Sequence, residues 1–494
     1  MSLVLMLTAW CTVLCDRARM CCFKICHELN IFSPWFFVYL MLSRFLFLSL
    51  QSNTKTNPPD ISDLTDIGFR GSCGGDDSSS AEEANLARYQ RLLDHISAFD
   101  ELPSEKRSAH REATLKHMFR AISHYATGES GRTLLQNRQD EIRTACFYCL
   151  RSGAAIAAEQ YAACRVLEVV SVVLGGDQDE YYESIDKTLR RIVMTTVSRA
   201  TPVRVAALRT LALTNVICAT YQESAEALMD FCEEVAAKEY RNHPVPDILR
   251  AAALDCWTLI GSTIPDIHLA GQDDFMIGRG LAILELLKDC LDSPAIELRS
   301  AAGECLALIH EARIDLGIAG DGGDKNTTAR QFAKGTWEGS DWEVLMDEVK
   351  QRIAELSTES GHHMSKKMKK QQRATFREFM STIVDDETPE EIVSFPGGSI
   401  ELHTWKEIVQ LNFIRHCTQG GFQVQLLTNE TLQDMFGADG QLLNARSDMS
   451  QLEKRLVLSK TSTAAKNADK ELARQRRQKD NAKNYFITAD EDGI

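Results

Sequence analysis

The sequence has little of what an enzyme uses to hold a phosphate, a metal ion or a reacting carbonyl group. Around Gly320 the run GDGGDKNTT lacks both the glycine spacing and the preceding strand of a phosphate-binding loop. No GxSxG turn presents a serine nucleophile. His362 and His363 are adjacent in a polar linker, so they are not spaced as metal ligands on one helix face. The acidic pair Asp385 and Asp386 is predicted to lie in a solvated turn. These absences indicate a non-enzymatic protein without a cofactor or a metal site.

Strand signals and disulfide patterns are also scarce. The fifteen cysteines do not form a disulfide framework, because eight of them fall in apolar helical stretches, where a free thiol packs as a small hydrophobic side chain. Cys146 and Cys149 form a CxxC, but no second CxxC or histidine pair completes a zinc site. A reducing compartment follows from this usage. The predicted buried thiols are Cys146, Cys149, Cys164, Cys218, Cys232, Cys256, Cys290 and Cys305.

Positive charge is concentrated at the C-terminal end. The formal net charge is −15, yet residues 361–494 carry 19 Lys and Arg against 19 Asp and Glu, so the first 360 residues carry all of the excess negative charge. Residues 451–488 hold 10 basic and 4 acidic residues, a local net charge of +6. An acidic body with cationic C-terminal patches is predicted, and only the patches would attract a polyanion.

The first fifty residues contain two apolar runs, residues 3–14 and 31–50, with Arg17, Arg19 and Lys24 between them. The second run approaches the length of a membrane span and has cationic residues before it, as a signal anchor would. The body shows no secreted character, however. Three alternatives stay open: an extension that arises from the choice of translation start, a membrane anchor, and a buried helix.

Helical periodicity begins near Ala81, after a Ser, Asp, Gly and Asn rich segment that cannot bury a core. It continues to about Asp315, with glycine and proline only at boundaries. The predicted divisions are a leader (1–50), a disordered linker (51–80), helical repeats (81–315), a linker with an amphipathic helix (316–365), a C-terminal module (366–440) and a basic tail (441–494).

A repeat appears when helices are aligned on small residues at their centres. Segments starting at Gln160, Arg204, Arg250 and Arg299 share Ala-Ala two residues in and a large residue seven in. Their starts lie about 45 residues apart, the period of HEAT and armadillo units. The predicted fold is therefore mostly α: a HEAT or armadillo-like α-solenoid, then a small α+β module and a basic helical tail. Its concave face is the predicted surface for protein partners.

The C-terminal module is predicted as β-α-β-α. Ile400 and Leu402 alternate as a half-buried strand, and Phe422, Val424 and Leu426 are predicted as a second strand. A helix is expected between them, with Trp405, Ile408, Val409 and Phe413 on one face, and Asn429 is suited to cap a short last helix.

Two basic segments are the candidate binding elements. The first covers residues 366–377 and contains no acidic residue. Two alternatives stay open for it: a helix that contacts phosphates, and a helix that is only solvated. The second is rich in Ala and Gln, has almost no apolar face, and would be ordered only by a polyanionic partner. Two aromatic residues then follow that could stack on bases. The candidate RNA- or partner-binding residues are Lys366, Lys367, Lys369, Lys370, Arg373, Arg377, Lys466, Lys470, Arg474, Arg476, Arg477, Lys479, Lys483, Tyr485 and Phe486.

The order of these C-terminal elements resembles a known family. The run KKMKKQQRATFREFM is followed by EEIVSFPGGSIELHTWKEIVQLNFIRHC and by GGFQVQLLTNETLQDMFG. This order is similar to the C-terminal region of the interferon-related developmental regulator family. The residues that carry the resemblance are Phe376, Arg377, Trp405, Gln425, Leu426, Asn429 and Phe436.

The resemblance implies a non-enzymatic regulator of gene expression with N-terminal helical repeats. It implies either a factor that associates with translationally inactive ribosomes or a transcriptional co-regulator. We therefore expect a scaffold that binds ribosomes or RNA through its basic tail. The alternative is a nuclear co-regulator that binds only proteins such as chromatin-modifying complexes, with the basic runs as nuclear localisation signals. Either function places the protein in the cytoplasm, the nucleus or both, and membrane attachment requires the leader.

Overall fold

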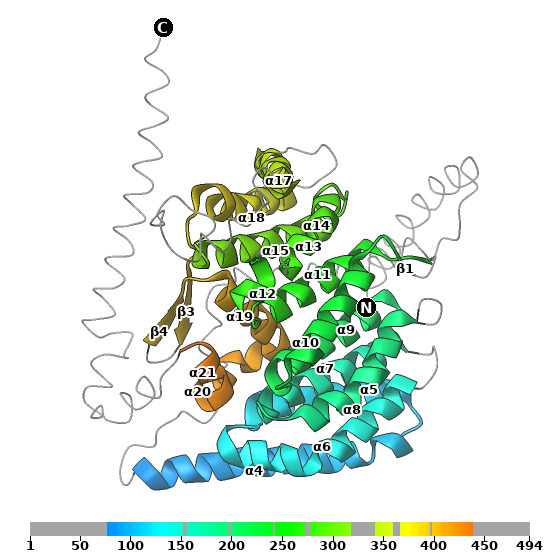
Figure 1. Ribbon diagram of the computed structural model, residues 1–494. Coiled ribbons are helices and arrows are strands. Elements are labelled where there is room, and N and C mark those ends of the chain that lie inside the picture. Colours follow the sequence, from blue (N-terminus) through cyan, green and yellow to red (C-terminus); the bar gives the residue numbers. More distant parts are fainter. Residues whose placement is uncertain are drawn as a thin grey trace, which may run out of the picture. The chain divides into compact units, whose positions relative to one another are not determined.

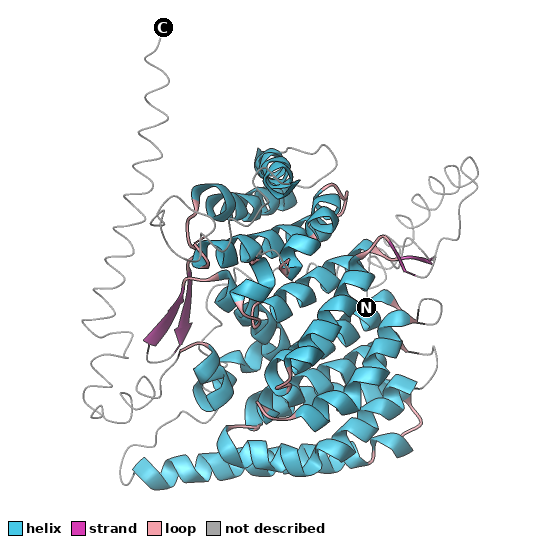
Figure 2. Cartoon of the chain, viewed as in Figure 1, coloured by secondary structure: helices cyan, strands magenta, loops and turns pink. Residues whose placement is uncertain are grey.

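The computed structural model is mostly helical, with two short antiparallel sheets (Figures 1 and 2). It describes residues 77–151, 156–195, 199–240, 243–271, 277–317, 341–358, 366–395 and 398–437. The chain divides into two units, Met1–Ala84 and Asn85–Ile494, and the described elements beyond the first turns of α4 belong to the second. The prediction of a mostly helical protein is confirmed.

Helices alternate along the chain between an outer layer and an inner layer. Each inner helix packs against the next inner helix and, from α7 onward, against the outer helix before it (Figure 1). The inner helices are α5 (Ser108–Tyr125), α7 (Ala157–Leu174), α9 (Thr201–Cys218), α11 (Asp247–Gly261), α15 (Ile296–Asp315) and α18 (Lys366–Asp385). The outer helices are α4 (Asp77–Asp100), α6 (Gly128–Arg151), α8 (Asp179–Met194), α10 (Gln222–Ala236), α14 (Leu284–Leu291) and α17 (Asp341–Thr358). The short connecting elements are η1 (Leu102–Ser104), β1 (Glu239–Tyr240), β2 (His243–Pro244), α12 (Asp266–Ala270) and α13 (Arg279–Ala282).

The aligned Ala-Ala pairs lie where the inner helices touch. Ala163 on α7, Ala207 on α9 and Ala302 on α15 are each fully buried. A methyl side chain at these positions lets neighbouring backbones approach closely, so the sequence repeat corresponds to a packing repeat.

The arginine that opens three of the aligned segments has a structural role. Arg204 donates from Nε to the Val193 carbonyl at the end of α8, at 2.7 Å. Arg250 does the same to Ala236 at the end of α10, at 2.7 Å, and Arg299 donates to the Ser293 carbonyl after α14, at 2.8 Å. The last carbonyls of a helix have no intrahelical partner and lie at its negative end, so a guanidinium satisfies both needs. The repeated arginine therefore fastens α9 and α11 to the outer helix before each of them, and α15 to the turn that follows α14.

The predicted amphipathic stripe of α17 is buried, as Met346, Val349, Ile353 and Leu356 show. These residues pack the helix against α18 and α14. The α17 stripe therefore contributes to the core.

The C-terminal module begins with a hairpin in which β3 (Glu391–Phe395) pairs antiparallel with β4 (Gly398–Leu402). Then follow α19 (Trp405–Thr418), η2 (Gln419–Gly421), α20 (Phe422–Thr428) and α21 (Glu430–Met435). The prediction of α19 and of a strand at Ile400 and Leu402 is confirmed.

The predicted second strand is wrong, because Phe422, Val424 and Leu426 lie in α20. Gln425 between them is buried as well, so burial there does not alternate as it does on a strand. The strand that pairs with β4 is β3, which lies before it in the chain and which the pattern Phe395-Pro-Gly-Gly-Ser could have indicated as one arm of a hairpin.

Candidate functional site

The first cationic segment forms the N-terminal half of α18. Lys366 is the first residue of that helix, and no acidic residue lies in the first turn. A helix N-terminus carries about half a positive charge, so lysines there add to its field instead of opposing it. This arrangement disfavours the isolated helix and favours an anion near its start. The side chains of the four lysines lie outside what the structure describes, while Arg373 is half-buried and Arg377 is exposed.

The other face of α18 belongs to the core. Phe376, Phe379 and Ile383 are buried against α15. Gly303 on α15 makes this approach possible, since a Cβ atom there would lie 2.5 Å from Phe379 Cδ2. Phe376, one of the residues that carry the family resemblance, is therefore a packing residue, and of the two described arginines it is Arg377 that faces solvent.

Helix α19 crosses the inner layer and contacts α7, α11 and α15 (Figure 1). At its N-terminus, Glu311 of α15 accepts hydrogen bonds from the backbone N–H groups of Trp405, at 2.5 Å, and Lys406, at 3.3 Å. Thr404 and Glu407 complete a reciprocal capping box. Burial raises the pKa of Glu311 to about 7, against the effect of the two N–H donors. A carboxylate of the repeat region therefore fixes where α19 begins.

Arg165 of α7 holds the other end of α19. Its guanidinium donates to the carbonyls of His416 and Cys417, the latter at 2.9 Å, and lies 5.1 Å from the centre of the Phe119 ring. It also forms a buried ion pair with Glu168, one turn further along α7. The cation thus meets the negative end of α19 while its charge is balanced from its own helix.

The following helices bind the ends of α5 and α7 through side-chain amides. Gln425 donates from Nε2 to the carbonyls of Ser123, at 3.1 Å, and Ala126, at 3.0 Å. Asn429 donates to the Val172 carbonyl at 2.8 Å, and its Oδ1 accepts from Leu432 N at 3.4 Å as the cap of α21. The predicted cap is confirmed, and the same side chain joins α21 to α7.

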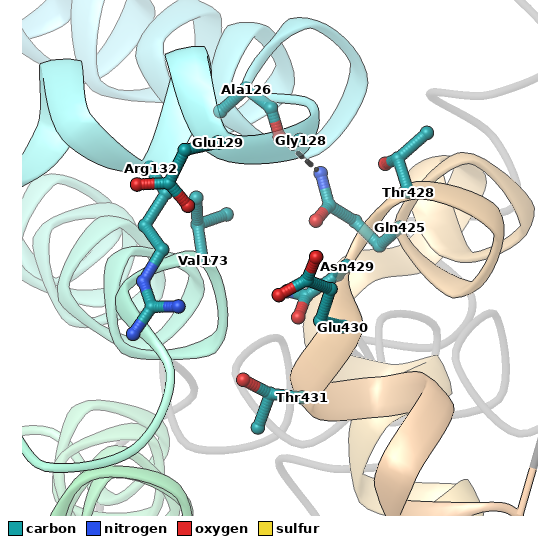
Figure 3. A pocket seen from close by; sticks show the side chains of 10 residues that line it. All are labelled: Ala126, Gly128, Glu129, Arg132, Val173, Gln425, Thr428, Asn429, Glu430 and Thr431. Carbon is teal, nitrogen blue, oxygen red and sulfur yellow. Dashed lines mark hydrogen bonds between the residues drawn. The ribbon is translucent and has the colours of Figure 1, made fainter. Parts of the chain in front are cut away.

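A pocket remains between this corner and the start of α6 (Figure 3). Its cavity volume is about 30 Å³, and it is partly open to solvent. A cavity of this volume has room for about two ordered water molecules and is too small for a metabolite or a cofactor. Its lining residues are Ala126, Gly128, Glu129, Arg132, Val173, Gln425, Thr428, Asn429, Glu430 and Thr431.

The C-terminal helices, defined as α19, η2, α20 and α21, thus lie on the inner layer from α5 to α15. Trp405, Gln425, Leu426 and Phe436 are buried there. Most of the residues that carry the resemblance therefore hold the chain's own C-terminal helices. A protein partner on the inner layer would meet α19 and α20 as well as the repeats.

A row of ionisable groups lies beneath α19 and α18. Arg209 of α9 pairs with Asp255 of α11 at 2.7 Å and lies 5.4 Å from the Phe413 ring centre. Burial, followed by the negative charge of Asp255, raises the pKa of Glu304 on α15 to about 8, against the effect of Arg209. Glu378 on α18 raises the pKa of Glu304 further, so carboxylates outnumber the guanidinium in this row and its charge depends on pH.

Comparison with known proteins shows the family to which this chain belongs. The family described as Interferon-related developmental regulator (IFRD) matches residues 62–384. The chain belongs to this family. It is 23% identical over 350 residues to interferon-related developmental regulator 1 of Mus musculus, covering 68% of this chain and 69% of that protein. It is 22% identical over 362 residues to interferon-related developmental regulator 2 of Mus musculus, covering 71% and 74%.

The family match ends within α18, so it contains the repeats and the first cationic segment. The β3–β4 hairpin and the C-terminal helices follow it. The interferon-related developmental regulators are a family of regulators, and this agrees with the non-enzymatic interpretation of the sequence.

The remaining predicted site residues lie outside the described part of the chain. These are Lys466, Lys470, Arg474, Arg476, Arg477, Lys479, Lys483, Tyr485 and Phe486. The leader, residues 1–50, also lies outside it, as do His362 and His363. Among the helices that the structure describes, none has the length and apolarity needed to cross a bilayer.

The cysteine prediction is confirmed for all eight residues, which are free and buried, and Cys417 on α19 adds a ninth. Burial raises the pKa of Cys164 and of Cys232 to about 12, so these thiols stay protonated and unreactive. Within the described ranges, no cluster of His, Cys, Asp and Glu side chains could hold a metal ion.

The sequence analysis missed Arg165 and Glu311, which position the C-terminal helices. The signal was present for the first of them: Arg165 and Glu168 are opposite charges one turn apart in the otherwise apolar run AACRVLEVVSVVL. Such a pair inside an apolar helix indicates a buried ion pair.

Proposed function

We propose that this chain is a non-enzymatic regulator of gene expression that associates with ribosomes or other RNA through its cationic C-terminal segments. The repeats, of HEAT or armadillo type, act as a scaffold and work in the cytoplasm, the nucleus or both. The observation that carries the proposal is the separation of charge, because residues 451–488 have a net charge of +6 on a chain of net charge −15. Membership of a family of regulators supports it.

The position of the first cationic segment agrees with an anionic partner. The first turn of α18 contains lysines and no acidic residue. Arg377 on the same helix is exposed. The buried face of α18 anchors this segment to the repeats. The segment therefore begins a helix whose other half is fixed to the repeats, and such a fixed element favours a defined binding site.

The test is ribosome co-sedimentation of the full chain across a salt series. Reversing the charges of Arg474, Arg476, Arg477 and Lys479 to Glu is expected to weaken binding at least tenfold and to reduce the slope of log K against log[salt] by about 3, since each phosphate contact on a single strand contributes about 0.7. The control replaces the three arginines by Lys, which keeps the charge and should keep the binding. Unchanged association of the Glu variant would contradict the proposal.

The alternative is a nuclear co-regulator that binds proteins only. The dense basic run Lys366–Arg373 favours it, since such runs act as nuclear localisation signals. In that case neither tail variant alters a ribosome interaction, and replacing the lysines of this run by Gln abolishes nuclear enrichment of the full chain.

A further inference from the structure

A cationic and aromatic surface lies on α4 and α5, in a part of the chain that the sequence analysis did not single out. Arg91 and His95 lie one turn apart on α4. The other residues of this surface lie on the turns of α5 that face α4. The α4–α5 surface is defined by Arg91, His95, His117, Arg120, His124 and Tyr125.

Flat side chains are aligned on this surface. The His95 ring is 6.4 Å from the His117 ring, with 10° between their planes, and 6.4 Å from the Tyr125 ring, with 14° between their planes. The Arg91 guanidinium lies 5.7 Å from the centre of the Tyr125 ring. His117 is exposed, and His95 and Tyr125 are half-buried. Three near-parallel rings with a guanidinium beside them present faces on which nucleic-acid bases can stack.

The charges of this surface are poorly balanced by acids. Burial and then the nearby His117 lower the pKa of His95, and burial and then Arg120 lower that of His124. The carboxylate that acts in the other direction on His95 is Asp94, which already accepts a hydrogen bond from Gln90 at 3.1 Å. Arg91 and Arg120 are exposed and have no carboxylate partner among the described side chains. The positive groups repel one another, and a bound anion would relieve that repulsion.

An ordinary solvent-exposed helix face would not combine unpaired cations with aligned aromatic rings. Elsewhere on the same helices the exposed cations are paired: Lys116 binds Glu112 one turn away on α5. The unpaired cations are those beside the aromatic rings. From His117 to His124 the surface extends about 10 Å along α5, enough for more than one phosphate.

We propose that the α4–α5 surface is a second contact for single-stranded RNA, separate from the C-terminal tail. This inference rests on the proposed function, since it names a further part of the chain that binds RNA. Single-stranded RNA fits because its unpaired bases can stack on His95, His117 and Tyr125 while its phosphates meet Arg91 and Arg120.

The test measures binding of the full chain to fluorescent single-stranded poly-U RNA by anisotropy across a salt series. The Arg91→Gln/Arg120→Gln variant is expected to bind roughly fivefold to tenfold more weakly, with the salt slope reduced by about 1.4 because two phosphate contacts are lost. The matched control is Lys187→Gln/Arg191→Gln on α8, which loses the same charge from two exposed positions one turn apart and should bind as the unaltered chain does. Equal affinities of the two double variants would overturn the inference.

A second arm separates RNA from acidic protein. Tyr125→Leu should weaken poly-U binding while leaving the binding of poly-glutamate unchanged, because only RNA stacks on the ring. Equal losses for both polymers would show a general site for acidic chains and overturn the RNA assignment. A thermal melt of each variant confirms that it is folded.

The two proposals fail separately. If the tail variant weakens ribosome binding and the α4–α5 variant leaves poly-U binding unchanged, the inference is wrong and the proposed function stands. If the α4–α5 variant weakens poly-U binding while the tail variant leaves ribosome binding unchanged, the inference stands and the tail is not the site of attachment.

Discussion

Arg165→Met is expected to lower the free energy of unfolding by about 3 to 5 kcal/mol, because it leaves the Glu168 carboxylate buried without its partner. The side chains of Arg165 and Glu168 are 5% and 1% exposed, so water cannot replace the lost cation. The change also leaves the carbonyls of His416 and Cys417 without their donor. Urea denaturation followed by circular dichroism measures the effect.

Two variants show whether the buried charge is the cause. Lys116→Met removes an exposed ion pair on α5 and should cost less than about 1 kcal/mol. Arg165→Met/Glu168→Leu removes both charges and should recover a large part of the loss. A double variant as unstable as the single one would mean that the bonds to α19, and not the unpaired Glu168, carry the energy.

The second large effect is on the pH dependence of stability. The pKa of Glu304 is about 8 in the folded protein and near 4.5 for an ordinary glutamate, so the folded state holds a proton that the unfolded chain releases between these values. Stability is therefore greatest at the acidic end of this window and falls as pH rises toward 8. Glu304→Gln removes the contribution of this residue to the pH dependence and should stabilise the protein at pH 8 by on the order of 2 kcal/mol relative to its effect at pH 5.

Thermal melts at pH 5 and pH 8 measure this difference. Glu285→Gln, which neutralises an exposed carboxylate on α14, should shift the melting temperature equally at both pH values. If Glu304→Gln also gave the same shift at both values, the carboxyl of Glu304 would be an ordinary solvated one, and its neighbours Asp255 and Arg209 would not influence it.

The contacts of the C-terminal helices bear on how the protein can bind partners. The inner layer of a helical repeat is its usual binding surface, and here α19 and α20 occupy it from α5 to α15. The proposed contacts with RNA are the start of α18, the tail and the α4–α5 surface. All three contain basic residues, which would let a protein of net charge −15 approach a polyanion.

Local patterns in the sequence were sufficient for several elements. The alternation of helices, the aligned Ala-Ala pairs, the stripe of α17 and the cap at Asn429 all depend on residues within one or two turns of each other. The buried cysteines belong to the same class, because their apolar neighbours in the chain are also their neighbours in the helix. These features depend on the periodicity of apolar side chains and on capping residues, and both can be identified from the sequence alone.

The C-terminal module was predicted only in part, since Phe422, Val424 and Leu426 alternate as on a strand yet form α20. What decides their conformation is the end of α5, about 300 residues earlier, whose carbonyls receive the Gln425 amide. Gly421 assists this contact, because a Cβ there would lie 2.4 Å from the Ser123 carbonyl oxygen. No local pattern contains that information.

The sequence by itself therefore determined that the chain is helical and repetitive, that it lacks the motifs of an enzyme, and that its dense basic runs lie near its C-terminus. The tertiary structure decided that Glu311 and Arg165 hold the two ends of α19, that the residues that carry the resemblance are mostly packing residues, and that α4 and α5 align a row of rings and arginines. Each of these depends on side chains from helices distant in the chain meeting at one place, where burial and charge, not helical period, set the energy.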